Sequence, residues 1–402
     1  MVNMNELFAF SRIHNIEMDL VPIVDKEAHF LLETEDLLFA RQSLVLAGAG
    51  KCSIFIGNTK PTVFESHIIR CRLNKKISNP YFYYYFFQSV HGRTVMETIA
   101  EQGAGASGIR GSDLVKLLVP CPSKSYQDAI VKILTPLDDR ISLLRETNTT
   151  LESIAKTLFT SWFVDFDPVK AKAEGLLPEG MDEDTAALFP SEFEESALGF
   201  IPKGWKVGRL GDVAQTVRKQ LQPSELNTDL HYVGLEHIPR QSLSLTNWDN
   251  AEGLGSAKSV FSKGDILFGK LRPYFHKVVI APFDGVCSTD ILICQPKHKA
   301  YYGLVTMYLY SSALVDYAAR LSNGAKMPRI NWKDLSDYPI CIPPESLAAE
   351  YSQVVIPLFE RMTEGVHQSQ TLTTLRDTLL PRLISGQLRL NQAQEIIDEV
   401  GA

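Results

Sequence analysis

The chain has 402 residues, 45% hydrophobic and 22% charged, a composition typical of folded globular protein with room for roughly two or three domains. No apolar run approaches the roughly 20 residues of a membrane-spanning helix, and no basic, then apolar, leader opens the sequence. We therefore expect a cytoplasmic protein without a membrane partner. The six cysteines lack the spacing of a zinc site or a disulfide framework, so we expect reduced thiols.

The net charge of −7 argues at first sight against a nucleic-acid partner. The charge is, however, concentrated in one segment. Residues 165–200 hold ten acidic residues against two lysines, which gives the segment a charge of −8 and leaves the rest of the chain at +1. We interpret this segment as a solvated acidic linker, so the global charge says little about local surfaces.

The chain contains an internal repeat. "IRGSDLVKLLVPCP" (109–122) matches "INWKDLSDYPICIP" (330–343) at an offset of 221, and "EDLLFAR" (35–41) matches "GDILFGK" (264–270) at an offset of 229. A mixed region followed by a long apolar-periodic region therefore occurs twice. We predict the following organisation: a mixed domain at 1–122, a helical region with the acidic linker at 123–200, a second mixed domain at 201–343, and a second helical region at 344–402.

The mixed regions contain short β-branched and aromatic runs broken by turn residues. "CSIFIG" (52–57), "HKVVIAP" (276–282) and "DILICQP" (290–296) predict strands. Residues 79–100 and 301–320 each predict one helix. The aromatic run at 81–87 could stack on bases, but it would surround a helix on all sides, so we favour core packing.

The two helical regions carry apolar residues at alternating spacings of four and three, the heptad pattern of a coiled coil. Pro136 and Pro357 coincide in the repeat and predict a kink or a restart in each helix. The simplest use of the two seams is antiparallel pairing of the helices, with a polar layer that helps to fix register. The predicted seam residues are Leu137, Ile141, Leu144, Asn148, Leu151 and Leu158 in the first helix, and Leu358, Met362, Ser369, Leu372 and Leu379 in the second.

The glycines of "QGAGASG" (102–108) spell G-x-G-x-x-G, the pattern of a dinucleotide-binding loop. Such a loop needs a strand before the glycines and a helix after them. Here a helix-like segment precedes them and a strand-like "LVKLLVP" (114–120) follows. The second copy has Lys326 and Arg329 where the first has Gly105 and Gly108. We therefore predict that this is not a dinucleotide-binding loop. We also predict no catalytic residue, no metal and no cofactor bound by this chain.

Three stretches carry a resemblance to a known family. "LFTSWFVDFDPVKAKAEG" (158–175), the segment 178–213 and "LLPRLISGQL" (379–388) resemble the specificity subunits of type I restriction–modification enzymes. The resemblance implies an α+β fold. It consists of a tandem duplication of a mixed α/β target-recognition domain plus a long helix, the two helices pairing as an antiparallel coiled coil.

The resemblance also implies a function. Each recognition domain reads one half of a bipartite site in double-stranded DNA, and the coil sets the spacing and docks two modification (methyltransferase) subunits. These use S-adenosylmethionine to methylate adenine, and restriction (translocase-nuclease) subunits join them, so ATP and Mg are expected on the partners. A helix over 125–163 would be roughly 55–60 Å long, which exceeds one turn of B-DNA and fits half-sites separated by an unread spacer.

The first copy of the repeat differs from the second copy at its start. The second domain opens with "IPKGWKVGRLGDV" (201–213), 63 residues before "GDILF", whereas 34 residues precede "EDLLF". We expect the first recognition domain to be short at its N-terminus.

DNA contact calls for Arg, Lys, Asn and Gln on exposed loops. In the second domain the loops at 268–277 and 323–331 qualify, and the first domain has comparable side chains at or near the equivalent places. The candidates are Lys270, Arg272, His276, Lys277, Lys326, Arg329 and Asn331 in the second domain, and Arg41, Gln42, Lys51, Arg93, Gln102 and Arg110 in the first. Two alternatives remain open: a coiled-coil scaffold with protein-binding ends, and a DNA-binding regulator that acts alone.

Overall fold

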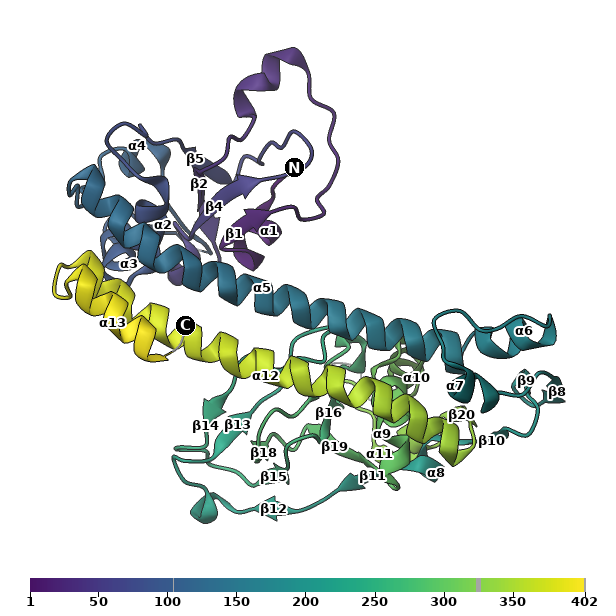
Figure 1. Ribbon diagram of the computed structural model, residues 1–402. Helices are drawn as coiled ribbons and strands as arrows, with labels where there is room; N and C mark the ends of the chain where they lie inside the picture. Colours follow the sequence, from purple (N-terminus) through teal and green to yellow (C-terminus); the bar gives the residue numbers. More distant parts are fainter. Residues whose placement is uncertain (104, 323–326, 401–402) are drawn as a thin grey trace. The chain divides into compact units, whose positions relative to one another are not determined.

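The computed structural model describes residues 1–103, 105–322 and 327–400. The chain divides into two compact units: Met1–Arg140 with Thr371–Ala402, and Ile141–Gln370. Two 40-residue helices, α5 (Lys124–Phe163) and α12 (Glu345–Ile384), contribute a segment to each unit (Figure 1). Each unit thus consists of a mixed α/β module packed on segments of both helices.

The module of the first unit is built on a four-stranded sheet with the order β1-β4-β2-β5. One of its two inner strands, β2 (Asp36–Ala40), is buried along its whole length, as expected for a strand covered on both faces. The other strands are β1 (Arg12–His14), β4 (Cys52–Gly57) and β5 (Ile68–Cys71). The helices and 3₁₀ turns of the module are α1 (Met4–Ala9), η1 (Asp25–Phe30), η2 (Leu46–Gly48), α2 (Pro80–Gln88), α3 (Val90–Glu97) and α4 (Gly111–Leu114), and α13 (Leu390–Val400) follows α12.

The module of the second unit has a sheet of order β11-β19-β16-β17 and a second, five-stranded sheet of order β12-β15-β18-β13-β14. The strands of the first sheet are β11 (Ala214–Val217), β16 (Ile266–Gly269), β17 (Val278–Ile280) and β19 (Ile291–Pro296). Those of the second are β12 (Gln220–Leu221), β13 (His231–Val233), β14 (Asp249–Asn250), β15 (Lys258–Phe261) and β18 (Gly285–Cys287). The other elements are β10 (Lys206–Arg209), α8 (Leu210–Val213), η3 (Pro223–Glu225), η4 (Pro273–Phe275), η5 (Lys299–Tyr301), α9 (Tyr302–Tyr310), α10 (Ser312–Leu321), α11 (Trp332–Ser336) and β20 (Pro339–Ile342).

The internal repeat is visible in the sheets. Strand β2 lies between β4 and β5, and β16 lies between β17 and β19, with antiparallel pairing throughout. The three strands predicted from 52–57, 276–282 and 290–296 are β4, β17 and β19, so these predictions are confirmed. The repeated sequence therefore encodes the same three-stranded frame in both units.

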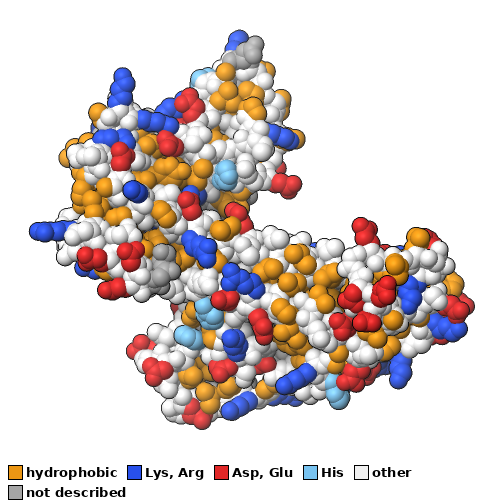
Figure 2. Space-filling view, viewed as in Figure 1, with side chains coloured by type: hydrophobic (Ala, Val, Ile, Leu, Met, Phe, Trp, Pro, Cys, Tyr) orange, Lys and Arg blue, Asp and Glu red, His pale blue; other side chains and the backbone are white. Residues whose placement is uncertain are grey.

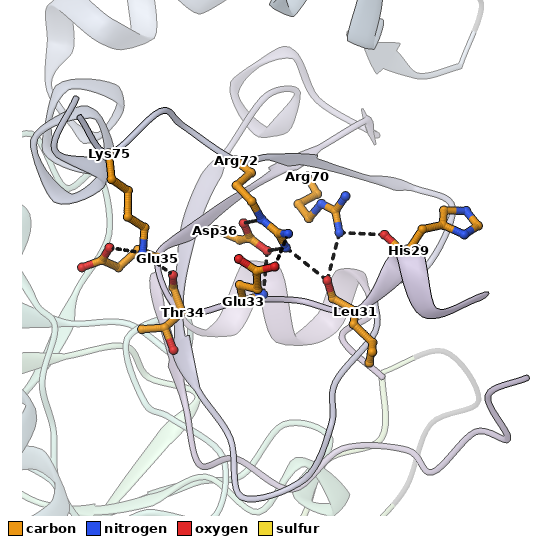
Figure 3. Close-up of polar contacts among 9 residues, drawn as sticks. All are labelled: His29, Leu31, Glu33, Thr34, Glu35, Asp36, Arg70, Arg72 and Lys75. Atoms are coloured by element: carbon orange, nitrogen blue, oxygen red, sulfur yellow. Dashed lines mark hydrogen bonds and ion pairs between the residues drawn. The ribbon is translucent and has the colours of Figure 1, made fainter. Parts of the chain in front are cut away.

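An aspartate opens the central strand of each frame. Asp36 accepts a hydrogen bond from the backbone N–H of Glu33, and Asp265 accepts one from Ser262, both at 2.8 Å. Arg72 also binds Asp36 with two hydrogen bonds of 2.7 Å, within a cluster of polar contacts that ties residues 29–36 to the end of β5 (Figure 3). Each aspartate thus fixes the turn into its strand, and the buried Asp36 is neutralised by Arg72.

Each predicted long helix of the mixed regions is in fact two helices, so that expectation is wrong. The chain breaks at Ser89 between α2 and α3, and at Ser311 between α9 and α10. Both serines have extended backbones, and their hydroxyls accept the N–H of Gly92 at 3.1 Å and of Leu314 at 3.3 Å. Each serine caps a new helix. Of the aromatic run 81–87, residues 82–87 are buried and Tyr81 is half-buried, which confirms core packing.

The two units differ in the strands that come from residues 206–217. In the second unit, β11 pairs with β19 and β10 pairs with β20. The first unit has no counterpart of either strand among its described residues: β5 is an edge strand, and residues 115–121 form no strand. The strand expected over 114–120 is therefore absent, and Val115 and Leu118 are 86% and 90% exposed.

The two long helices pair in each unit. In the first, the Tyr126 hydroxyl donates to the carbonyl of Leu383 at 3.3 Å, and Arg376 binds Asp138 at 2.7 Å. In the second, Asn148 Nδ2 donates to the carbonyl of Met362 and the Tyr351 hydroxyl to that of Ala155, both at 3.0 Å. The residue number on α12 falls as that on α5 rises. The antiparallel pairing predicted from the sequence is therefore confirmed.

The predicted seam lies at this pairing. Most of its members are buried, and Leu151, Leu158 and Leu358 are half-buried. Neither helix ends at its proline, because α5 continues through Pro136 and α12 through Pro357, so the alternative of a restart is wrong. Leu134 and Leu137 are buried beside Pro136, and this packing holds the helix together where the proline removes a backbone hydrogen bond.

The acidic segment is folded, so its description as a linker is wrong. It forms α6 (Asp167–Ala173), α7 (Glu183–Ala187), β8 (Phe193–Ser196) and β9 (Gly199–Pro202). Val169 and Phe189 belong to the hydrophobic core of the second unit. All ten acidic side chains are exposed, and red side chains gather in Figure 2 where Figure 1 shows these elements. The acidic side chains are solvated as expected. Apolar side chains of the same segment pack into the core and thereby hold the segment in its folded form.

In the second unit, the polar seam residue Asn148 of α5 faces a glycine of α12. This side chain is 7% exposed, its Nδ2 donates to Met362, and its buried Oδ1 has no hydrogen-bond partner within the described residues. Gly365 lies opposite, and a Cβ added there would stand 2.6 Å from Oδ1. The absence of a side chain at Gly365 is therefore what allows Asn148 into the seam.

We predict that Gly365→Ala destabilises the chain by about 1–3 kcal/mol, because the new methyl group overpacks the seam. In an Asn148→Ala background the same change should stabilise by up to about 1 kcal/mol, because alanine favours the helix and the amide is gone. Urea unfolding of the four variants of this cycle measures both effects. An equal effect of Gly365→Ala in the two backgrounds would contradict the assignment.

Candidate nucleic-acid interface

A cavity of about 710 Å³ opens on the second unit, beside the end of the repeated frame. Its wall comes from the ends of β11 and β19, from β15, and from the chain around residues 329–332. Three cationic side chains and two amides line it: Arg218, Lys270, Arg329, Gln220 and Asn331. Long donors of this kind around an open cavity suit the acceptors of a nucleic acid.

Backbone hydrogen bonds bring the two predicted loops of this unit together. Leu271 and Arg329 form an isolated antiparallel bridge, the N–H of Ile330 donates to Lys270 at 3.1 Å, and that of Arg272 donates to Pro328 at 2.7 Å. Lys270, Arg329 and Asn331, predicted from loops about sixty residues apart in the sequence, therefore share one cavity.

Two residues of this cavity were not predicted from the sequence. Arg218 follows β11 and Gln220 begins β12, in a segment without a counterpart in the first copy. The available signal was the polar run "RKQ" at 218–220 between two strand-like stretches.

His276 and Lys277 do not stand on an exposed loop, so that expectation is wrong for both. His276 is 8% exposed, and its Nε2 hydrogen-bonds the carbonyl of Tyr310 at 2.8 Å. Burial lowers the pKa of His276. The half-buried Lys277 donates to the carbonyl of Leu235, and burial lowers its pKa too, with a further contribution from Arg240. Arg272 is half-buried, and Lys326 lies outside the described residues.

The first unit presents its candidates on a small sheet of order β3-β7-β6. Its strands are β3 (Gln42–Ser43), β6 (Glu101–Gln102) and β7 (Ser107–Gly108). Gln42 pairs with Gly108, and the N–H of Ile109 donates to the carbonyl of Arg41 at 2.9 Å. Arg110 forms an exposed ion pair of 2.7 Å with Glu101. The sheet thus gathers four exposed candidates: Arg41, Gln42, Gln102 and Arg110.

The described residues of the G-x-G-x-x-G pattern follow β6 and include β7, and the two strands pair antiparallel. The N–H of Gly103 donates to the carbonyl of Ala106 at 2.9 Å, which closes the turn between the two strands. A Cβ on Gly108 would lie 2.9 Å from the carbonyl oxygen of Arg41, so this glycine permits the close approach of β3. No helix of the described residues begins at the third glycine, so the segment lacks the geometry of a dinucleotide loop.

The other two candidates of the first unit bind backbone carbonyls. Lys51 donates to Phe8 at 2.8 Å, and Arg93 donates to Ala47 at 2.8 Å and to Ala49 at 3.3 Å. Burial lowers the pKa of Lys51, and the charge of Arg93 lowers it further. These side chains hold the turn around η2, so their donors are already engaged within the unit.

Among the described residues, no group of three or more His, Cys, Asp or Glu side chains is placed to hold a metal ion. Within the same residues, no helix combines the length and apolarity needed to cross a membrane.

The sequence matches the family described as "Type I restriction modification DNA specificity domain" twice, over residues 19–153 and 202–356. The chain belongs to this family. Each match covers one copy of the repeat and extends into the long helix of that copy. The predicted family resemblance is therefore confirmed.

Individual relatives support this family assignment. The chain is 27% identical to the type I restriction enzyme MjaIX specificity subunit of Methanocaldococcus jannaschii, over 77% of this chain and 69% of the relative. It is 25% identical to the HindI specificity subunit of Haemophilus influenzae, over 96% and 92%. The crystal structure of a type I system S subunit from M. genitalium matches with a TM-score of 0.52 at 16% identity, covering 93% of this chain and 88% of the other. The predicted α+β fold with two tandem domains and long helices is confirmed.

The pH dependence of this specificity domain's stability gives a test of the buried His276. The unfolded chain protonates a histidine near pH 6.5, whereas the folded chain does so only at lower pH, since the pKa of His276 is lowered. The unfolded state therefore binds more protons below about pH 6.5, and the free energy of unfolding decreases as the pH is lowered. We predict a smaller loss of melting temperature from pH 7.5 to 5.5 in His276→Gln than in wild type. The exposed His298→Gln, the matched control, should lose as much as wild type.

Proposed function

We propose that this chain is the DNA-binding specificity subunit of a type I restriction–modification complex, and that each recognition domain reads one half of a bipartite site. The observation that carries the proposal is the duplication of a DNA specificity domain within one chain. In the second copy, arginine, lysine and amide side chains converge on one cavity. In the first, exposed donors gather on the sheet β3-β7-β6.

These side chains match the chemistry of DNA reading. Arginine and lysine bind the guanine edge or phosphates, and glutamine and asparagine bind the adenine edge in the major groove. The two units offer different sets: Arg41, Gln42, Gln102 and Arg110 in one, and Arg218, Gln220, Lys270, Arg329 and Asn331 in the other. We therefore assign them different half-sites.

The proposal leaves catalysis to partners. The long helices set the spacing of the half-sites and dock two modification subunits, which methylate adenine with S-adenosylmethionine, and restriction subunits with ATP and Mg join them in the cytoplasm. The relatives' names as specificity subunits of restriction enzymes support this division. The alternative of a protein-binding scaffold requires no sequence-dependent DNA affinity, so a DNA experiment separates the two.

The decisive experiment is modification mapping. Host DNA from strains with and without this gene is sequenced for methylated adenine. We expect a bipartite methylated motif that disappears when the gene is deleted and returns when it is restored. A motif that survives the deletion, or the absence of any motif while the methyltransferase is expressed, would contradict the proposal.

We predict that Lys270→Ala weakens DNA binding by the assembled methyltransferase by roughly tenfold, because a cation in the cavity is lost. If Lys270 contacts a phosphate, the slope of log affinity against log salt should also fall by about 1. Binding is measured by fluorescence anisotropy on a duplex that carries the mapped motif, at several salt concentrations. Lys299→Ala, an exposed lysine outside this cavity, is the control, and an equal loss in the two variants would remove Lys270 from the interface.

A further inference from the structure

Arg329 is held in the cavity by a carboxylate. Its Nε donates to Asp290 Oδ1 at 3.1 Å and its Nη2 to Asp290 Oδ2 at 3.2 Å. The arginine side chain is 49% exposed and the aspartate 26% exposed, so the pair stands at the surface without being fully solvated. Two parallel hydrogen bonds fix the plane of a guanidinium, which one contact does not.

The backbones of Asp290 and Arg329 are both held by the residues that follow β16. The N–H of Lys270 donates to the carbonyl of Asp290 at 3.0 Å, and Arg329 forms the bridge with Leu271. Asp290 is also fixed by its own N–H, which donates to the Ser288 hydroxyl at 3.2 Å. The carboxylate and the arginine, 39 residues apart, are therefore positioned by one short stretch of chain.

The geometry leaves a defined edge of Arg329 for a ligand. A guanidinium has five N–H groups, and Asp290 takes the side edge formed by Nε and one N–H of Nη2. The opposite end carries an N–H of Nη1 and the second N–H of Nη2, which are parallel to each other and are not used by Asp290. Two parallel donors match the O6 and N7 acceptors of guanine in the major groove.

The charge balance favours a base over a phosphate. Asp290 neutralises the arginine locally and would repel an anion, so the pair gains little from phosphate binding. A neutral base edge with two acceptors has no such cost. Gln220 and Asn331 in the same cavity also suit base edges.

We propose that Arg329, positioned by Asp290, reads a guanine in the half-site of the second recognition domain. This rests on the proposed function and adds the identity of one base. The first copy has Gly108 at the position of Arg329, so the assignment applies to one half-site.

The test uses the full chain assembled with its methyltransferase, and a duplex DNA library in which both half-sites are randomised. Bound sequences are selected and counted for wild type, Arg329→Ala, Arg329→Lys and Asp290→Asn. We expect wild type to select a guanine at one position, and both Arg329 variants to lose that preference by tenfold or more, about 1.4 kcal/mol. Asp290→Asn should reduce the same preference while its affinity for the unselected library stays equal or rises, since a negative charge is removed.

A modified base and a control ion pair make the test more specific. Replacing the selected guanine by 7-deazaguanine, which lacks the N7 acceptor, should weaken binding by wild type and leave Arg329→Ala unaffected. The exposed pair Arg209–Asp337, at 2.8 Å and outside the cavity, supplies the control, so Asp337→Asn should change no preference.

Three results would overturn the assignment. Arg329→Ala could weaken all sequences equally and lower the salt slope, which would make Arg329 a phosphate contact. Alternatively, the variants could keep the guanine preference of wild type. A wild-type complex that selects no sequence overturns the proposed function itself, and thereby also the reading of a base by Arg329. Melting temperatures of the variants confirm that each is folded.

Discussion

The first unit depends on one buried carboxylate of α5. Asp138 is 4% exposed, and it accepts a hydrogen bond from the Tyr85 hydroxyl of α2 at 2.9 Å and another from Arg376 of α12 at 2.7 Å. A buried carboxylate is stable only when it is paired in this way. Asp138 therefore joins three elements at one point: α2, which packs on the four-stranded sheet, and the two long helices α5 and α12. The position of the small sheet with the exposed donors follows from this attachment, because α2 packs on the frame strands β2 and β4.

The second unit uses a different carboxylate of the same helix for the same purpose. Glu152 accepts hydrogen bonds from the Tyr310 hydroxyl and from the N–H of Leu243 at 2.7 Å. It lies 14 residues beyond Asp138 in the sequence of α5. The repeat counterparts on α12 are Phe359 and Thr373, which carry no charge. The duplication has thus kept the frame of each module and changed the means by which it is fixed to the helices.

The sequence predicts those parts that depend on periodicity or on repetition. The heptad seam and the frame strands are of this kind, since each was visible as a local pattern and occurred twice. The breaks at Ser89 and Ser311 were missed because a serine inside an apolar run caps a helix only where tertiary packing turns the chain. His276 and Lys277 were misplaced because residue type does not tell which side of a loop faces the core. The pairing of Arg329 with Asp290 joins residues 39 apart, so it could not be predicted from either loop alone.

Some donors occupy equivalent positions of the two modules with different side chains, such as Arg41 and Lys270, and others come from parts of the modules that differ. Asp36 and Asp265 make the same turn at the start of the same strand. By contrast, the glycine hairpin at 103–108 in one copy corresponds to a stretch in the other that ends in Arg329 and carries the bridge to Leu271. Arg218 and Gln220 come from a segment without any counterpart. A frame held by buried contacts tolerates such changes at its rim, because the exposed loops contribute little to the core. Divergence of what each copy binds therefore requires no change in the elements that fold it.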